Sequence, residues 1–142
     1  MFDVALRRLV DPALIRVAAW VSGARISANA LTISGAILGL GAAVCITQSH
    51  FAAALVFIVL NRIFDGLDGA IARINGPTEL GGYLDILCDY VIYLSVPVAF
   101  AWIDPANQLP ALILVASFTL TAVSFLAFAA IAARQWRRRP GS

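Results

Sequence analysis

The sequence predicts an all-α protein, a polytopic membrane bundle of about four transmembrane helices preceded by N-terminal interfacial helices. Of its 142 residues, 61% are hydrophobic and 13% are charged, which is roughly half the charged fraction of a soluble domain. The apolar residues fall into four stretches, each near the ~20 residues that cross the hydrocarbon core of a bilayer. Polar or turn-forming segments separate these stretches, so we expect a single membrane domain over residues 1–142.

The first 28 residues differ from the rest of the chain because arginines alternate with apolar side chains. Asp11 followed by Pro12 is typical of a helix start. The segment is too charged to span a bilayer, so we expect short amphipathic helices that lie in the interface. The same charges argue against a cleavable signal peptide. A solvated helix that packs on the rest of the protein is the alternative interpretation.

Four membrane spans are expected at about 30–48, 51–73, 81–102 and 109–133, so that residues 30–133 form the membrane region and 134–142 a basic tail. In the first span, Gly35 and Gly39 have the GxxxG spacing that permits close helix approach. In the third, Pro97 should kink the helix because it removes one backbone hydrogen bond.

The arginines indicate how the spans are oriented. They precede the first span, end the second and follow the fourth, whereas the turns at 48–50 and 103–108 contain none. The positive-inside rule therefore places both termini and the 74–80 loop in the cytoplasm. The net charge of +2 is too small to suggest a nucleic-acid partner.

Half of the eight acidic residues form two pairs near the 74–80 loop. Asp65 and Asp68 are three positions apart in the second span, and Asp85 and Asp89 are four apart in the third, so each pair shares a helix face. Because the loop is short, we expect these two helices to pack antiparallel with the acidic faces meeting. A charged aspartate near the bilayer centre costs about 2.5–3.5 kcal/mol, so protonation, water or cations must compensate.

Metal binding is the compensation that the surrounding residues favour. Carboxylate oxygens select hard cations such as Mg²⁺, Mn²⁺ or Ca²⁺. Two divalent cations would balance four carboxylates, and such sites are common in displacement at phosphorus. Glycines at 66, 69, 81 and 82 leave room for a bulky group beside the backbone. Arg73 can bind a phosphate, or it marks the membrane boundary as a snorkelling side chain.

The spacing of this region is D-x2-D-G-x2-A-R-x7-G-x3-D-x3-D, formed by Asp65, Asp68, Gly69, Ala72, Arg73, Gly81, Asp85 and Asp89. It closely resembles the signature of the CDP-alcohol phosphatidyltransferase family, membrane enzymes of phospholipid synthesis. The family usually has one or two more residues between the arginine and the next glycine than the seven found here. The stretch from Ser27 to Thr32 also resembles the family's Pro-Asn-x-Leu-Thr entry to the first span, without the proline. A plain helix cap at Ser27 or Asn29 is the alternative interpretation.

The resemblance implies a membrane phosphotransferase that moves a phosphatidyl or other substituted phosphate group from a CDP-linked alcohol, such as CDP-diacylglycerol, to an acceptor alcohol, with release of CMP. It implies two divalent cations, Mg²⁺ or Mn²⁺, as cofactors. The implied site residues are Asp89 as catalytic base, Asp65, Asp68, Asp85 and Asp89 as metal ligands, and Gly69, Ala72, Arg73 and Gly81 as substrate ligands. The donor, the acceptor, membrane lipids and a second copy in a homodimer are the expected partners. The expected location is the inner (cytoplasmic) membrane of a bacterium.

Two other functions are compatible with the same residues. Family members usually continue for two further spans beyond the four expected here, so this chain would lack the last two. A truncated, non-catalytic relative that binds metal and CDP-alcohol, or serves as an assembly subunit, is therefore a second hypothesis. A small divalent-cation transporter is a third, because intramembrane carboxylates also line ion paths. The glycines and arginine beside the aspartates fit nucleotide binding better than transport.

Overall fold

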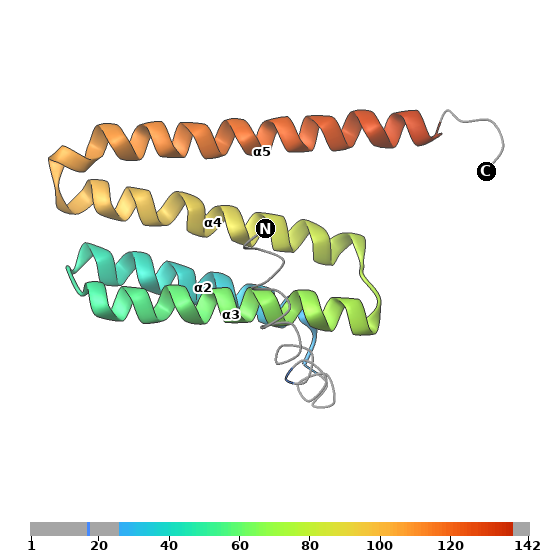
Figure 1. Ribbon diagram of the computed structural model, residues 1–142, viewed down its shortest axis with the longest axis horizontal. Coiled ribbons are helices and arrows are strands. Elements are labelled where there is room, and N and C mark those ends of the chain that lie inside the picture. The colour runs from blue at the N-terminus through green and yellow to red at the C-terminus, as the bar shows by residue number, and fades with distance from the viewer. Residues whose placement is uncertain (1–16, 18–25, 138–142) are drawn as a thin grey trace, which may run out of the picture.

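Four long helices make up almost all of the described chain (Figure 1). The computed structural model describes residue 17 and residues 26–137, with side chains as far as residue 134. The elements are α2 (Ala28–Thr47), α3 (Phe51–Asn75), α4 (Glu79–Ile103), the short 3₁₀ helix η1 (Pro105–Asn107) and α5 (Gln108–Arg137). These helices confirm the all-α fold class. The interfacial helices expected before residue 28 lie almost wholly outside the described residues, as do residues 138–142 of the basic tail.

The ends of the helices follow from local sequence. The side chain of Ser27 caps α2 by accepting a hydrogen bond from the backbone N–H of Ala30 at 3.2 Å. Thr78 caps α4 in the same way, with a 3.0 Å bond from Gly81, and both are residue types that favour the N-cap. Between α3 and α4, Gly76 adopts a φ of 92°, a left-handed conformation that glycine accepts without steric cost.

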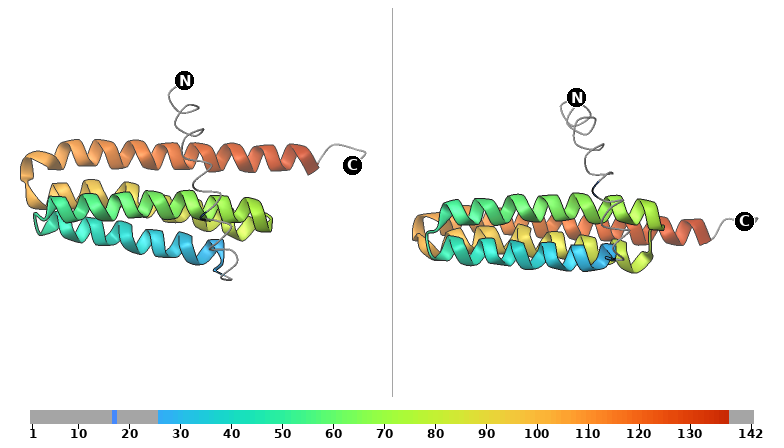
Figure 2. Two further views of the ribbon diagram at one scale, coloured as in Figure 1. Left: turned by 60° about the horizontal axis from the view of Figure 1, so that its bottom comes forward. Right: turned by 90° about the horizontal axis from the view of Figure 1, so that it is seen from below.

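The helices α2, α3 and α4 form one group, and α5 packs along α4 (Figures 1 and 2). The close backbone contacts join α2 to α3 and α2 to α4, whereas α3 and α4 approach each other less closely. This differs from the expectation that the second and third spans pack directly on each other. The acidic side chains of α3 and α4 occupy the space between these helices, and the small residues of α2 allow a closer approach to both.

The two glycines of the GxxxG pair in α2 face two different helices. A Cβ atom at Gly35 would lie 3.4 Å from the side chains of Asn61 and Phe64 on α3. A Cβ atom at Gly39 would overlap Cγ1 of Ile92 on α4 and lie 2.7 Å from its Cδ1. The two glycines therefore let α2 approach both helices, which is the role that small residues have in membrane bundles.

Two apolar clusters hold the group together. One is formed by Leu31, Leu67, Ala70 and Ile71, and the other by Ala43, Ile46, Ala54 and Ala99. Along α3, Asn61 lies between the two clusters and is only 3% exposed. Its side-chain Nδ2 donates to the carbonyl oxygen of Gly35 at 2.9 Å, which satisfies a polar group that would otherwise be costly to bury.

The helices identify the chain as an integral membrane protein. Three segments are long and apolar enough to cross a bilayer: Ala28–Thr47, Glu79–Ile103 and Pro105–Arg134, with mean hydropathies of 2.0, 1.8 and 2.3. The charged residues in its C-terminal half keep α3 out of this set. However, α3 has 25 residues, about 37 Å of helix, and lies alongside α2 in all views (Figure 2). We infer that it crosses the membrane together with α2.

Candidate functional site

Three of the four predicted aspartates meet between α3 and α4. Asp65, Asp68 and Asp85, named here the acidic cluster, each place one carboxylate oxygen within 4.8 Å of the others. Asp68 is buried, Asp65 is half-buried and Asp85 is exposed. Oxygen ligands on opposite sides of one Mg²⁺ or Ca²⁺ ion lie about 4–5 Å apart. The spacing and the oxygen-only donor set of the acidic cluster therefore fit a hard divalent cation.

The buried member of the cluster is fixed by α2. Asp68 is 4% exposed, and one of its carboxylate oxygens accepts a hydrogen bond from Oγ1 of Thr32. Thr32 is itself only 8% exposed. Because a carboxylate accepts several hydrogen bonds, this contact leaves further lone pairs of Asp68 available for a cation. The sequence alone indicates Thr32 only as part of the entry to the first span.

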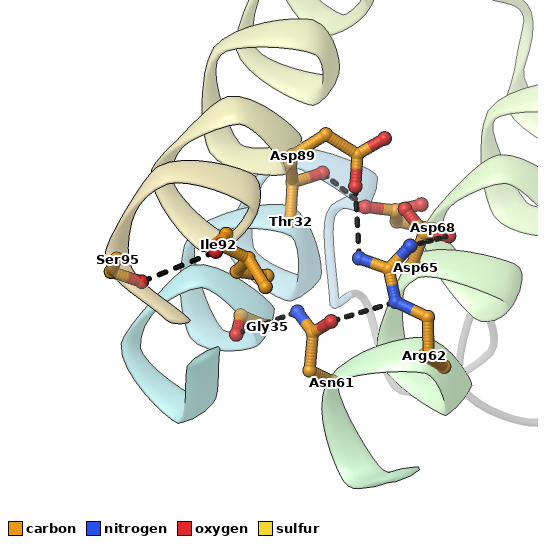
Figure 3. A network of polar contacts seen from close by, with 9 residues as sticks. All are labelled: Thr32, Gly35, Asn61, Arg62, Asp65, Asp68, Asp89, Ile92 and Ser95. Atoms are coloured by element: carbon orange, nitrogen blue, oxygen red, sulfur yellow. Dashed lines mark hydrogen bonds and ion pairs between the residues drawn. The ribbon is translucent and has the colours of Figure 1, made fainter. Parts of the chain in front are cut away.

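Asp89, the fourth predicted aspartate, does not belong to the acidic cluster. Its Oδ1 accepts a hydrogen bond from Nη2 of Arg62 at 2.9 Å, and Nη1 of the same guanidinium lies 3.8 Å from Oδ2 of Asp65 (Figure 3). The structure thus places Asp89 next to the cluster but pairs it with an arginine. Its roles as catalytic base and as metal ligand stay predictions.

Arg62 was not foreseen as part of the site. Its Nε donates to Oδ1 of Asn61 at 2.8 Å, and its guanidinium carbon lies 5.9 Å from the centre of the Tyr93 ring (Figure 3 shows the polar contacts). The spacing of Arg62 and Asp65, three residues apart on one helix, could have indicated their ion pair. The contact with Asp89 depends on how α3 and α4 are placed and could not have been found that way.

A cavity of about 370 Å³ adjoins the acidic cluster, where α2 and α4 begin and α3 ends. This volume is in the range of small-molecule sites. Asp68 and Asp85 line it, so carboxylates of the cluster face the cavity. Its other lining residues are Ser27, Ala28, Asn29, Thr32, Gly69, Ala72, Asn75, Gly76, Pro77, Thr78, Gly81 and Gly82.

The predicted substrate residues are distributed around this cavity. Gly69, Ala72 and Gly81 line it, whereas Arg73 does not. The Arg73 guanidinium nevertheless lies beside Gly69, because a Cβ atom there would be 3.7 Å from Nη1. At Gly81 a Cβ atom would lie 2.9 Å from Oγ1 of Thr78. Any side chain at Gly81 would therefore push into neighbours at the cavity wall.

A second, much smaller cavity lies among the carboxylates themselves. It measures about 10 Å³, roughly the space of a single water molecule or ion. Its lining residues are Thr32, Gly35, Ala36, Asn61, Asp65, Asp68, Asp85, Cys88, Asp89 and Ile92. Together the two cavities provide a space of about one ion among the carboxylates and, next to it, room for a small molecule.

The fold and this constellation define a membrane protein with an intramembrane carboxylate site that opens on a cavity. The family model of CDP-alcohol phosphatidyltransferase matches residues 25–140. The chain belongs to this family, as the aspartate signature indicated.

Known relatives agree with the assignment. Over 142 residues the chain is 39% identical to the inner membrane protein YnjF of Escherichia coli (strain K12), and the match covers 99% of this chain and 69% of YnjF. It is 34% identical to a phosphatidylcholine synthase of Pseudomonas aeruginosa over 52% of this chain. It is 35% identical to a phosphatidylcholine synthase of Borreliella burgdorferi over 51% of this chain. The chain spans 33% of the length of each of these two synthases. No solved structure matches the chain significantly.

Proposed function

We propose that this protein transfers a substituted phosphate group from a CDP-linked alcohol to an acceptor alcohol, with release of CMP, in phospholipid biosynthesis. The observation that carries the proposal is the acidic cluster at the wall of the 370 Å³ cavity. Family membership supports the same reaction class. CDP-diacylglycerol is the donor that we propose, and a small alcohol is the acceptor.

The acidic cluster would hold divalent cations, Mg²⁺ or Mn²⁺, which supply positive charge to the diphosphate of the donor. Asp65, Asp68 and Asp85 are proposed as the ligands, and Asp68 is held for this role by Thr32. Gly69, Ala72 and Gly81 leave the cavity wall without large side chains, so the nucleotide can approach the helix backbone. Arg73, beside Gly69, is proposed to bind a phosphate oxygen.

Asp89 is proposed as the general base. In the reaction, the hydroxyl oxygen of the acceptor forms a bond to the phosphorus that carries the alcohol group, and the bond from that phosphorus to the CMP oxygen breaks. The hydroxyl proton passes to Asp89. Positioning and charge neutralisation by the fixed side chains would supply most of the catalysis.

We also propose a location, an orientation and an oligomeric state for the protein. We propose that residues 1–142 form one membrane domain in a bacterial inner membrane, with the cavity on the cytoplasmic side. Arg73 at the α3 end supports this orientation. A homodimer is proposed on family analogy alone.

Turnover tests the proposal. Purified protein in lipid vesicles is given CDP-diacylglycerol, Mg²⁺ and a panel of small alcohols, and released CMP is measured. We expect CMP release that depends on one of the acceptors and stops when a chelator removes the metal. No CMP release with any acceptor, while the protein still binds Mg²⁺ and CDP-diacylglycerol, would favour a non-catalytic binding protein.

A further inference from the structure

Arg62 is a charged side chain at the centre of the site that the proposed chemistry leaves without a role. Its guanidinium is held on three sides: Nε bonds Asn61, Nη2 bonds Asp89 and Nη1 faces Asp65. Asn61 is in turn fixed to the backbone of Gly35 on α2. Although the Arg62 side chain is 40% exposed, these contacts from α3 and α4 fix its orientation.

The space available for cations between Asp89 and the acidic cluster is small. The oxygens of the acidic cluster lie within 4.8 Å of one another, a spread that one cation fills. The cavity that these carboxylates share with Asp89 measures about 10 Å³, which is about one ion in size. The guanidinium of Arg62 contacts both Asp65 and Asp89, so a second cation bound to these two carboxylates would compete with it.

We propose that Arg62 is a positioning residue that holds Asp89 apart from the acidic cluster, so that the resting site binds one divalent cation and a second must displace Arg62. The inference rests on the divalent-cation site of the proposed function. Asp65, Asp68 and Asp85 would bind the first cation. Arg62 would give the site a fixed positive charge that does not depend on metal concentration.

The same arrangement orients Asp89 for its proposed role as base. One carboxylate oxygen faces the Arg62 guanidinium, and the other points away from it (Figure 3). Among the described residues no hydrogen bond is recorded to the second oxygen, which leaves it available to accept a proton.

Binding of Mn²⁺ alone to the purified, detergent-solubilised protein, followed by electron paramagnetic resonance, tests the inference. We expect one tight site in the wild type and a second, weaker one. Asp85→Asn should weaken the tight site by at least about tenfold, whereas Asp89→Asn should leave it unchanged. Arg62→Gln should tighten the weak site about fivefold, since the competing ion pair is gone, and Arg62→Lys should keep it weak.

Arg134→Gln on the exposed face of α5 serves as the control for removing an arginine, and both sites should keep their affinity. An unchanged tight site in Arg62→Gln shows that the variant folds. Two equal Mn²⁺ sites in the wild type, or a tight site that Asp89→Asn weakens as much as Asp85→Asn does, would overturn the inference. One tight site without CMP release would support it while contradicting the proposed function, and no Mn²⁺ binding at all would overturn both.

Discussion

Asp68 is an aspartate with 4% exposure inside a membrane bundle, where an unpaired carboxylate would be strongly unfavourable. The hydrogen bond from Thr32 satisfies part of its need for partners. The remaining lone pairs lie close to those of Asp65 and Asp85. Three carboxylates at this separation repel one another, so the arrangement is stabilised when a cation joins them.

The contact between Thr32 and Asp68 leads to a prediction about metal affinity. Thr32→Val keeps the shape of the side chain but removes the hydroxyl donor. Because partners that orient a metal ligand affect affinity strongly, we expect Mn²⁺ binding to weaken about tenfold or more. The measurement is a Mn²⁺ titration of the purified protein.

Two variants accompany this test. Thr32→Ser retains the hydroxyl and should bind Mn²⁺ nearly as well as the wild type. Ser34→Ala, on the same helix, removes a hydroxyl that bonds only the backbone carbonyl of Ala30 in the described structure, and should have no effect. Equal Mn²⁺ affinity in Thr32→Val and the wild type would mean that Thr32 does not orient Asp68.

The aspartate pairs were predictable from sequence because i,i+3 and i,i+4 spacing fixes a shared helix face without tertiary information. Thr32 and Arg62 were not recognised as site residues. Thr32 reaches Asp68 across 36 positions, and Arg62 reaches Asp89 across 27. Such pairs depend on how the helices are placed, which periodicity alone does not determine.

The helices themselves were easier to predict than their packing. Long apolar stretches with polar breaks and caps such as Ser27 and Thr78 determine where a helix begins, so all four expected spans correspond to α2, α3, α4 and α5. The central position of α2 was not expected. It follows from Gly35 and Gly39, which face different helices, whereas the polar side chains of the site lie between α3 and α4.

The close approach of α2 and α4 predicts that Gly39→Ala destabilises the protein. The new Cβ atom would overlap Ile92, and overpacking of this kind typically lowers the free energy of unfolding by about 1–3 kcal/mol. Thermal unfolding in detergent measures the change. Combining Gly39→Ala with Ile92→Ala removes the overlap and should relieve the strain.

Gly82→Ala is the matched control on α4. A Cβ atom at Gly82 would have no atom within 4 Å, and alanine is favoured over glycine in a helix by about 1 kcal/mol. We therefore expect unchanged or slightly higher stability. Gly39→Ala with the stability of Gly82→Ala would contradict the packing of α2 on α4.

At the scale of the whole molecule, both cavities lie toward one end of the bundle. The connection from α3 to α4 is at that end, and the connections from α2 to α3 and from α4 to α5 are at the other (Figure 1). The proposed substrates would therefore enter from the side of the membrane that the α3–α4 connection faces. The positive-inside rule predicts that this side is the cytoplasm.

Topology reporters check this orientation. Alkaline phosphatase, which is active only outside the cytoplasm, can be inserted at Pro77 in the α3–α4 connection or at Ala106 in η1. Because Arg73 lies in the last turn of α3, next to the connection that contains Pro77, we expect activity from the Ala106 fusion and none from the Pro77 fusion. Activity from the Pro77 fusion alone would place the site on the opposite side of the membrane.

If the acidic cluster is the centre of phosphotransfer, CMP release must depend on its carboxylates, and a matched pair of aspartate variants measures this dependence. Asp85→Asn removes one carboxylate of the cluster, whereas Asp104→Asn changes an aspartate that caps η1 at the opposite end, where asparagine caps equally well. With CDP-diacylglycerol, Mg²⁺ and the acceptor panel, we expect wild-type CMP release by Asp104→Asn. For Asp85→Asn we expect CMP release to fall about 100-fold or more, the scale seen when an active site loses one electrostatic group. Equal CMP release by Asp85→Asn and Asp104→Asn would contradict this role of the acidic cluster.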